Sequence, residues 1–138
     1  MGFLNFFQNQ QTNDSQLALL EGQEATLIDS TEPTRKLANE RLLNEATKRG
    51  GNQRTYRRIN AAAVQQMLGE NPAQLYDALG IPRHIRKNLP QEAKEALMVG
   101  DIAAFEQILN DNAIGHDSLV ESATEGYRKA RGIFRWNR

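Results

Sequence analysis

The sequence predicts an all-α fold of about six short helices in a small orthogonal bundle, with a flexible N-terminal arm. Apolar residues recur at intervals of three and four along most of the chain after Pro33, the period of a helix packed on one face. Glycines stand where these stretches end, and no alternating strand pattern of useful length competes with them. The 138 residues, 39% of them hydrophobic, suffice for one core, and the absence of cysteine excludes disulfides and a thiol nucleophile.

The chain divides into an arm, a helical domain and a tail. Seven of the first sixteen residues are Asn or Gln, and such polar amides bury too little apolar area to offset chain entropy. The tip of the arm carries aromatic residues that suit either docking into a partner's groove or folding back onto the same domain. These N-terminal docking candidates are Phe3, Phe6 and Phe7. The predicted parts are 1–32, a flexible acidic arm; 33–132, the helical domain; and 133–138, a basic aromatic tail.

Start and stop signals give the helices in order. Pro33 suits a first helical turn, Asp101 follows Gly100 as an N-cap, and Ser118 with Glu121 has the spacing of a capping box. Glycine tolerates the left-handed conformation that ends a helix, so a glycine at the end of an apolar helical stretch is a candidate stop. These candidate stops are Gly50, Gly51, Gly69, Gly80, Gly100 and Gly115. The predicted helices are 34–49, 55–68, 72–79, 90–99, 102–112 and 117–131.

Formal net charge is zero, but the charges are segregated along the chain. Residues 1–34 carry five acids and no base, residues 35–58 carry eight bases and two acids, and residues 91–125 carry eight acids and one lysine. Two interpretations stay open at this point. The charges form internal salt bridges and solvated helix faces, or they make a bipolar molecule whose basic pole meets an anionic partner.

Residues that carry catalytic or metal chemistry are sparse. The two histidines, His84 and His116, have no partner at the spacing of a helical metal site. The run from His116 to Ser118 holds the residue types of a catalytic triad, but three consecutive side chains cannot form its geometry, and a cap at Ser118 is the preferred interpretation. Glu121 and Glu125 are expected to be solvated surface. With no Walker loop, dinucleotide fingerprint or nucleophile elbow, we expect no cofactor, no metal and no enzymatic activity.

Three basic clusters are the candidate binding sites. The first, residues 48–58, joins two predicted helices through Gly-Gly and includes Tyr56, which stacks on a base or, as we prefer, belongs to the core stripe. The second is residues 83–87, and in the third, residues 127–138, aromatic and basic residues interleave. That interleaving suits nucleic acid, an acidic protein groove or an interface with a basic rim. The candidate residues are Arg54, Arg57, Arg58, Arg83, Arg86, Lys87, Arg128, Lys129, Arg131, Phe134, Arg135 and Trp136.

Residues 75–89 have the outline of a helix-turn-helix, with an apolar helix, a glycine turn and a basic second segment. Two positions depart from that motif. Tyr76 stands where a small residue is usual, and Arg86 stands where an apolar one is usual. Pro90 also limits the second helix to about two turns. The motif is therefore degenerate.

A longer segment resembles a known group of proteins. Ile59–Gly69 is followed by Asn71–Leu75, Leu79–Pro82 and Asn88–Leu97, so that a leucine-glycine pair, a helix, a second leucine-glycine pair, a basic loop and a helix succeed one another. This order resembles a helical segment in phage-encoded antirepressor-like and DNA-damage-inducible proteins of bacteria, over about residues 55–109. The resemblance implies a phage or mobile-element origin and action through protein contact.

These observations lead us to expect a small, non-enzymatic, helical interaction or regulatory protein that binds a protein or a protein–nucleic-acid assembly. The first alternative is a DNA- or RNA-binding regulator with a degenerate helix-turn-helix, and the second is a virion or assembly component that forms homo-oligomers. No run approaches the roughly 18 apolar residues of a membrane span. We therefore expect the protein in the host cytoplasm, or in a virion if it is encoded by a phage.

Overall fold

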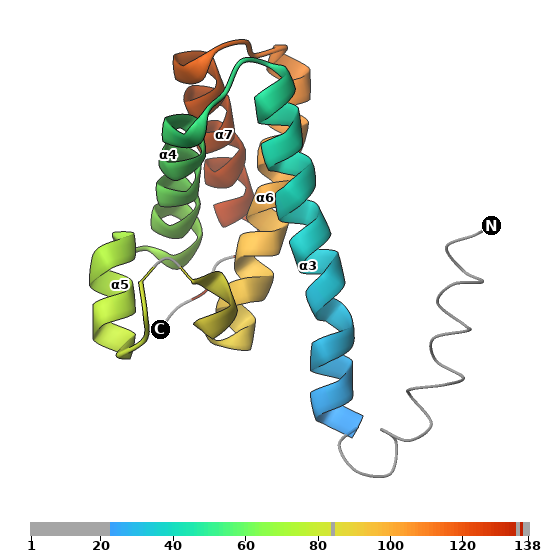
Figure 1. Cartoon of the computed structure of the whole chain (residues 1–138), viewed down its shortest axis with the longest axis vertical. Coiled ribbons are helices and arrows are strands. Elements are labelled where there is room, and N and C mark those ends of the chain that lie inside the picture. The colour runs from blue at the N-terminus through green and yellow to red at the C-terminus, as the bar shows by residue number, and fades with distance from the viewer. Residues whose placement is uncertain (1–22, 84, 135, 137–138) are drawn as a thin grey trace, which may run out of the picture. The chain divides into compact units, whose positions relative to one another are not determined.

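The computed structural model describes residues 23–83, 85–134 and 136, with side chains from residue 33 onward. The chain divides into two units, residues 1–34 and residues 35–138, and the site lies in the second. All regular structure in the described residues is helical, which confirms the all-α prediction, with five α-helices in place of six (Figure 1). They are α3 (Gln23–Lys48), α4 (Gln53–Ala63), α5 (Pro72–Leu79), α6 (Gln91–Asp111) and α7 (His116–Arg131). The candidates Phe3, Phe6, Phe7 and Arg135, and also His84, lie outside the described residues.

The first three described helices follow most of the predicted boundaries. α3 begins at Gln23 rather than at 34, and Pro33 lies inside it instead of in its first turn. α4 is capped by Asn52 and continues as a π-helical turn, Val64–Leu68. α5 has the predicted bounds, because the side chain of Asn71 accepts a hydrogen bond from the first turn and Gly80 adopts the left-handed conformation at the end.

The predicted helix stop at Gly100 is wrong. α6 runs through it without a break, so the two helices predicted at 90–99 and 102–112 are one. A Cβ atom at residue 100 would lie 2.7 Å from Cδ1 of Tyr127 and 2.8 Å from Cγ of Met67. Glycine is therefore required there for close packing, not for a turn. Asp101, expected as an N-cap, is buried in the middle of the same helix.

The capping box predicted at Ser118 and Glu121 is also wrong. α7 begins two residues earlier, at His116, and its N-cap is Gly115, which has a positive φ of 87° and makes no side-chain cap. Position 115 therefore starts a helix rather than ending one, and α6 ends instead at Asn112, a left-handed residue with φ 50°. In the last part of α7 the backbone of Gly126 meets α6, since a Cβ there would lie 2.6 Å from Cα of Ala104.

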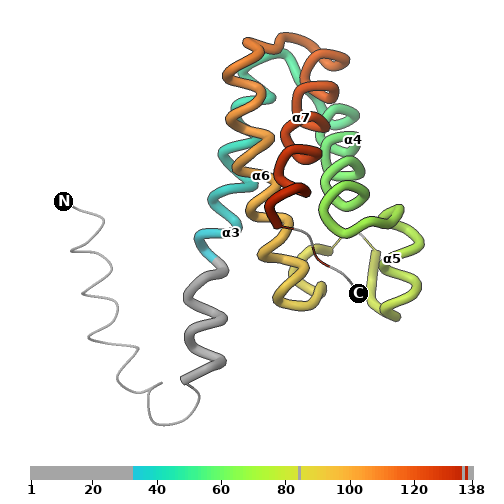
Figure 2. The backbone as a smooth tube through the Cα atoms, turned by 180° about the vertical axis from the view of Figure 1, so that it is seen from behind, coloured from blue at the N-terminus to red at the C-terminus, as the bar shows by residue number. Residues whose placement is uncertain are grey.

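The core lies between the helices of residues 35–138. Figures 1 and 2 show α4, α6 and α7 lying lengthwise beside one another, which differs from the orthogonal bundle expected from the sequence. The tail continues this core, because Trp136 is buried and its backbone N–H donates to the carbonyl of Met67 at 3.2 Å. The largest fully buried apolar and aromatic side chains are Tyr76, Tyr127, Leu42, Ile59, Met67, Leu75, Leu97, Ile108, Leu119 and Val64.

Candidate binding groove

An open groove of about 830 Å³ brings parts of two predicted basic clusters together. α3 and α4 form its walls, and the segment after α5 supplies the remaining side. Arg57 comes from the first cluster, and Arg86 and Lys87 come from the second, 29 and 30 residues later in the chain. The groove is lined by Asn39, Leu43, Tyr56, Arg57, Ile59, Asn60, Ala61, Pro72, Ile85, Arg86 and Lys87. None of these lining residues is acidic.

The apolar and charged parts of the lining differ in their surroundings. Leu43, Pro72 and Ile85 give the groove an apolar surface, and the Ile85 side chain is exposed. Arg57 and Lys87 are exposed cations, and neither makes an ion pair with any residue that the structure describes. An apolar lining with unpaired positive charge is suited to a ligand of the opposite charge.

Arg86 is held in the groove by a buried polar network. Its Nε donates to Oδ1 of Asn60 at 3.0 Å, and its Nη1 donates to Oδ2 of Asp101 at 2.8 Å. Asp101 is only 1% exposed, and it also accepts hydrogen bonds from the hydroxyl of Tyr127 at 2.7 Å and from Nδ2 of Asn39 at 3.2 Å. These contacts join α3, α4, α6 and α7 at one carboxylate.

The charges of this network depend on one another. Burial by itself would lower the pKa of Arg86, but the negative charge and the hydrogen bond of the adjacent Asp101 carboxylate raise it above its ordinary value. Burial raises the pKa of Tyr127 well above 10.0, and the negative charge of Asp101 raises it further. At neutral pH the tyrosine is therefore a neutral donor, and the arginine is a permanent cation with a fixed orientation.

Arg83, the other arginine of the second cluster, does not line the groove. Arg83 makes two hydrogen bonds, 3.0 and 2.6 Å, to the carboxylate of Asp77, and both side chains are exposed. The hydrogen bond from Arg83 lowers the pKa of Asp77. After α5 the structure has a three-residue 3₁₀ turn, Arg86–Asn88, at the position where a helix-turn-helix places its recognition helix. Within the described residues 81–83 and 85–90, this segment therefore has no α-helix.

The first cluster divides between surface and structure. Arg54 and Arg58 are exposed on α4, on the side away from its buried residues. Arg49 instead joins the two loops at one end of the domain, because it pairs with Glu45 at 2.8 Å and donates to Asn112 Oδ1 at 3.0 Å and to the carbonyl of residue 113 at 3.2 Å. Its guanidinium therefore stabilises the fold.

Tyr56 belongs to the core, which is the interpretation preferred from the sequence. Its ring packs against the core, and the residue also lines the groove. Its hydroxyl forms a hydrogen bond with the hydroxyl of Thr47.

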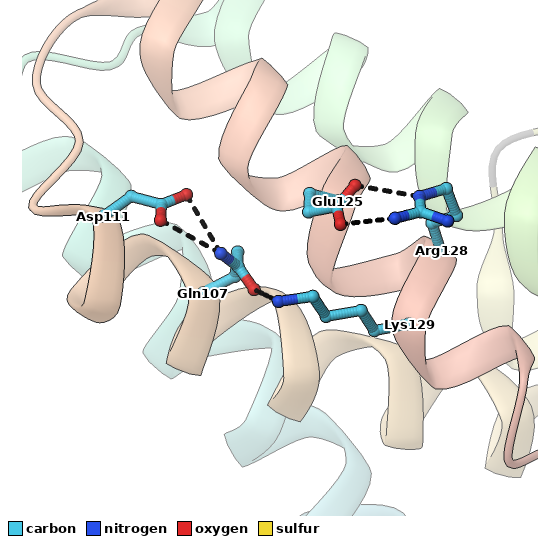
Figure 3. Close-up of polar contacts among 5 residues, drawn as sticks. All are labelled: Gln107, Asp111, Glu125, Arg128 and Lys129. Atoms are coloured by element: carbon cyan, nitrogen blue, oxygen red, sulfur yellow. Dashed lines mark hydrogen bonds and ion pairs between the residues drawn. The ribbon is translucent and has the colours of Figure 1, made fainter.

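The third cluster lies beside a different hollow, of about 890 Å³, between α6 and α7. Figure 3 shows its polar side chains pointing toward one another. Arg128 makes two bonds of 2.8 and 2.6 Å to Glu125, and Lys129 donates to Gln107 at 2.9 Å. Gln107 in turn donates to both oxygens of Asp111 at 3.0 and 3.1 Å. Asp111 and Glu125, two of the three acids that line this hollow, thus have hydrogen-bond donors within the protein.

Hydrogen bonds also lower the pKa values of two acids in this hollow, Asp111 and Glu125. Ser122 donates to Oδ2 of Asp111 at 2.7 Å, and this bond, together with that from Gln107, lowers the pKa of Asp111. The pKa of Glu125 is lowered by its hydrogen bonds from Arg128. Both carboxylates are therefore held in their charged form by neighbours already present.

The aromatic tail is divided between core and solvent. Trp136 is 9% exposed, Phe134 is 38% exposed and Ile133 is 88% exposed. Arg131 is exposed on α7. The tryptophan therefore packs on its own domain, and its ring is not free to stack on a nucleobase.

Sequence reasoning missed four residues of the groove network: Asn39, Asn60, Asp101 and Tyr127. Asp101 offered a signal, because it is an acid within the apolar stretch from Leu97 to Ile108, but the preceding glycine made a cap the simpler interpretation. No local signal marks the two asparagines.

Among the described residues, no group of three His, Cys, Asp or Glu side chains is placed to hold a metal ion. None of the helices in the same part of the chain is both long and apolar enough to cross a membrane. No protein-family model and no curated protein matches this chain.

Proposed function

We propose that this protein is a non-enzymatic interaction module whose groove binds an acidic, apolar-bearing segment of another protein. The observation that carries the proposal is the lining of the groove. It combines an apolar surface with two exposed cations that have no ion pair among the described residues, Arg57 and Lys87, and it contains no acid. The partner would bury one or two apolar side chains and place its carboxylates near the cations. A phage or mobile-element origin and a cytoplasmic location belong to the same proposal, supported by the resemblance of residues 55–109.

The size of the groove fits this kind of partner. A volume of about 830 Å³ is within the roughly 300–1,000 Å³ range of ordinary ligand sites. It accommodates a few side chains of a short segment rather than the face of a folded domain. We therefore expect modest affinity and clear charge selectivity.

Nucleic-acid binding is the second candidate, because Arg54, Arg57 and Arg58 are all exposed on α4 without an ion pair among the described residues. Such a row can contact a phosphate backbone. A protein partner is favoured because a phosphate backbone has no apolar group that could be buried against the apolar lining. Arg83, Arg86 and Arg128 pair with acids of the same chain, and the Trp136 ring is buried.

The test is a selection of random peptides displayed on a surface against the full-length protein. We expect enriched peptides to combine Asp or Glu with Leu, Ile or Phe. The double variant Arg57→Glu/Lys87→Glu should lose them, while the matched control Lys48→Glu/Arg131→Glu, with the same change of charge at exposed residues outside the groove, should keep them. Enrichment of peptides without acids, or equal binding to both double variants, contradicts the proposal.

A second measurement separates the alternatives. Fluorescence anisotropy with an unrelated labelled oligonucleotide at rising salt should show only weak binding. Tight binding that weakens steeply with salt, and that is lost in Arg54→Glu/Arg58→Glu, would favour the nucleic-acid regulator instead. Elution volume that depends on protein concentration in size-exclusion chromatography would favour the assembly component.

A further inference from the structure

Arg86 differs from the other cations of the groove because its guanidinium is held in place and still has a nitrogen without a hydrogen-bond partner in the described part of the chain. Its side chain is 23% exposed, and its Nε and Nη1 atoms are bound to Asn60 and Asp101. The third nitrogen, Nη2, makes no hydrogen bond with any described residue and is not sealed from solvent. A planar guanidinium held at two nitrogens keeps the direction of its remaining donors, so little rotamer freedom is lost when a ligand binds there.

We propose that Nη2 of Arg86 is a subsite for one carboxylate of the partner segment. This inference rests on the proposed function and adds to it the group that is recognised. Lys87, next in the chain, and Arg57, across the groove, supply further positive charge around the same ligand. The neighbouring Leu43 and Ile85 lower the exposure of the site to water and strengthen the hydrogen bond.

Charge balance favours a carboxylate over a phosphate dianion. Asp101 already compensates the charge of Arg86, so the two residues together leave little net positive charge at this point. A singly charged carboxylate needs one more donor and modest positive potential, which Nη2 and Lys87 provide. A dianion would need more positive charge at Nη2 itself, where Asp101 already compensates Arg86.

Asp101 and Tyr127 are positioning residues in this arrangement. The Tyr127 hydroxyl fixes Oδ1 of Asp101, whose Oδ2 fixes Nη1 of Arg86, so the orientation of Nη2 is set from the buried side of α7. Loss of that hydroxyl should weaken carboxylate binding without any change in the residues that line the groove.

The test follows the side-chain NMR signals of Arg86 in the full-length protein during titration with sodium acetate at constant ionic strength. We expect a saturable shift of the Arg86 Nε–H signal in the millimolar range, with a smaller shift for methyl phosphate and none for sodium chloride. Unshifted Arg86 signals at saturating acetate overturn the inference. A larger response to methyl phosphate than to acetate overturns the choice of carboxylate.

Two hydroxyl deletions provide the matched comparison. Tyr127→Phe keeps the ring in the core but should raise the acetate concentration at half-saturation about fivefold, the effect of one ordinary hydrogen bond. Thr124→Val removes a hydroxyl that donates to the carbonyl of Val120 on α7, outside the groove and the Arg86 network, so it should leave the titration unchanged. Equal effects of the two variants would contradict the positioning role.

Arg86→Lys keeps the charge without the planar fork. Neither this variant nor Arg86→Ala has the Nε–H signal, so both are followed through the backbone amide signal of Lys87, and we expect equally weak acetate binding. Binding retained in the lysine variant would show that only charge matters. Because acetate needs no partner protein, this result stands apart from the peptide selection. Peptides that bind while acetate leaves Arg86 unshifted would contradict the subsite and leave the proposed function intact.

Discussion

The groove and the hollow between α6 and α7 have similar volumes, about 830 and 890 Å³, and opposite chemistry. The hollow is rich in charged and polar side chains, but Asp111 and Glu125 already have donors from their own chain. The groove has fewer polar groups, and Arg57 and Lys87 have no ion pair within the described residues. Positive charge left unpaired, rather than volume or the number of polar residues, distinguishes a surface that can bind an acidic partner.

The carboxylate of the groove network is buried and those of the hollow are more exposed. This difference gives the largest expected effect on the free energy of unfolding. Asp101→Ala should lower the free energy of unfolding by about 3–5 kcal/mol, because Arg86 keeps a charge without its partner and Tyr127 loses its acceptor. Asp111→Ala, in the exposed hollow, should cost far less. Urea denaturation of both variants measures the two losses. Equal losses would show that the groove network is no more structural than the surface pairs.

Close contact between α6 and α7 should give the next largest effect. In Gly126→Ala the new methyl group would meet the backbone of Ala104, and we expect a loss of about 1–3 kcal/mol in the free energy of unfolding. The control is Gly132→Ala, where φ is −69° and the nearest atom is 3.4 Å away. Thermal and urea unfolding should place that control within about 0.5 kcal/mol of the parent. Similar losses at both glycines would contradict the tight contact.

Acid should weaken the stabilising contacts of the hollow. The pKa values of Asp111 and Glu125 are lowered in the folded protein from 3.8 and 4.5. Their stabilising effect is therefore fully present above those unfolded values and is lost as pH falls through the lower folded values. Asp111→Asn/Glu125→Gln should make the loss of stability shallower in urea titrations from about pH 6 to about pH 3. An unchanged slope would show that these pairs add nothing.

The exposed cations of the groove should give the smallest effect on stability. Arg57→Ala/Lys87→Ala removes two charges with no ion pair among the described residues, so the free energy of unfolding should change by no more than about 0.5 kcal/mol. The measurement is urea denaturation beside the parent protein. A clear loss of stability would mean that these residues hold the fold, and would remove the basis for treating them as binding residues.

Sequence patterns predicted those parts of the fold that depend on neighbours along the chain. Asn71, Pro72 and Gly80 defined α5 at both ends, since a cap, a fixed φ and a left-handed stop act within one turn. The same rule gave the wrong result at Gly100, because the sequence does not distinguish a glycine that ends a helix from one that allows Tyr127 to approach.

The candidate site was predictable only in part, for a related reason. Residues Arg57, Arg86 and Lys87 were identified as basic candidates from local charge. Their meeting in one groove, and the separation of Arg83 from it, depended on how α4 packs near the segment after α5. Which arginines remain free is decided by carboxylates that lie elsewhere in the fold.

By itself, then, the sequence determined that this chain is helical and which short segments are rich in positive charge. Helical periodicity and charge are properties of residues a few positions apart, so they can be seen without the fold. Only the tertiary structure decided that Asp101 orients Arg86, because Asn39, Arg86, Asp101 and Tyr127 come from segments far apart in the chain. Burial removes the water that would otherwise solvate these groups, and the resulting need for partners fixes the arrangement of the groove.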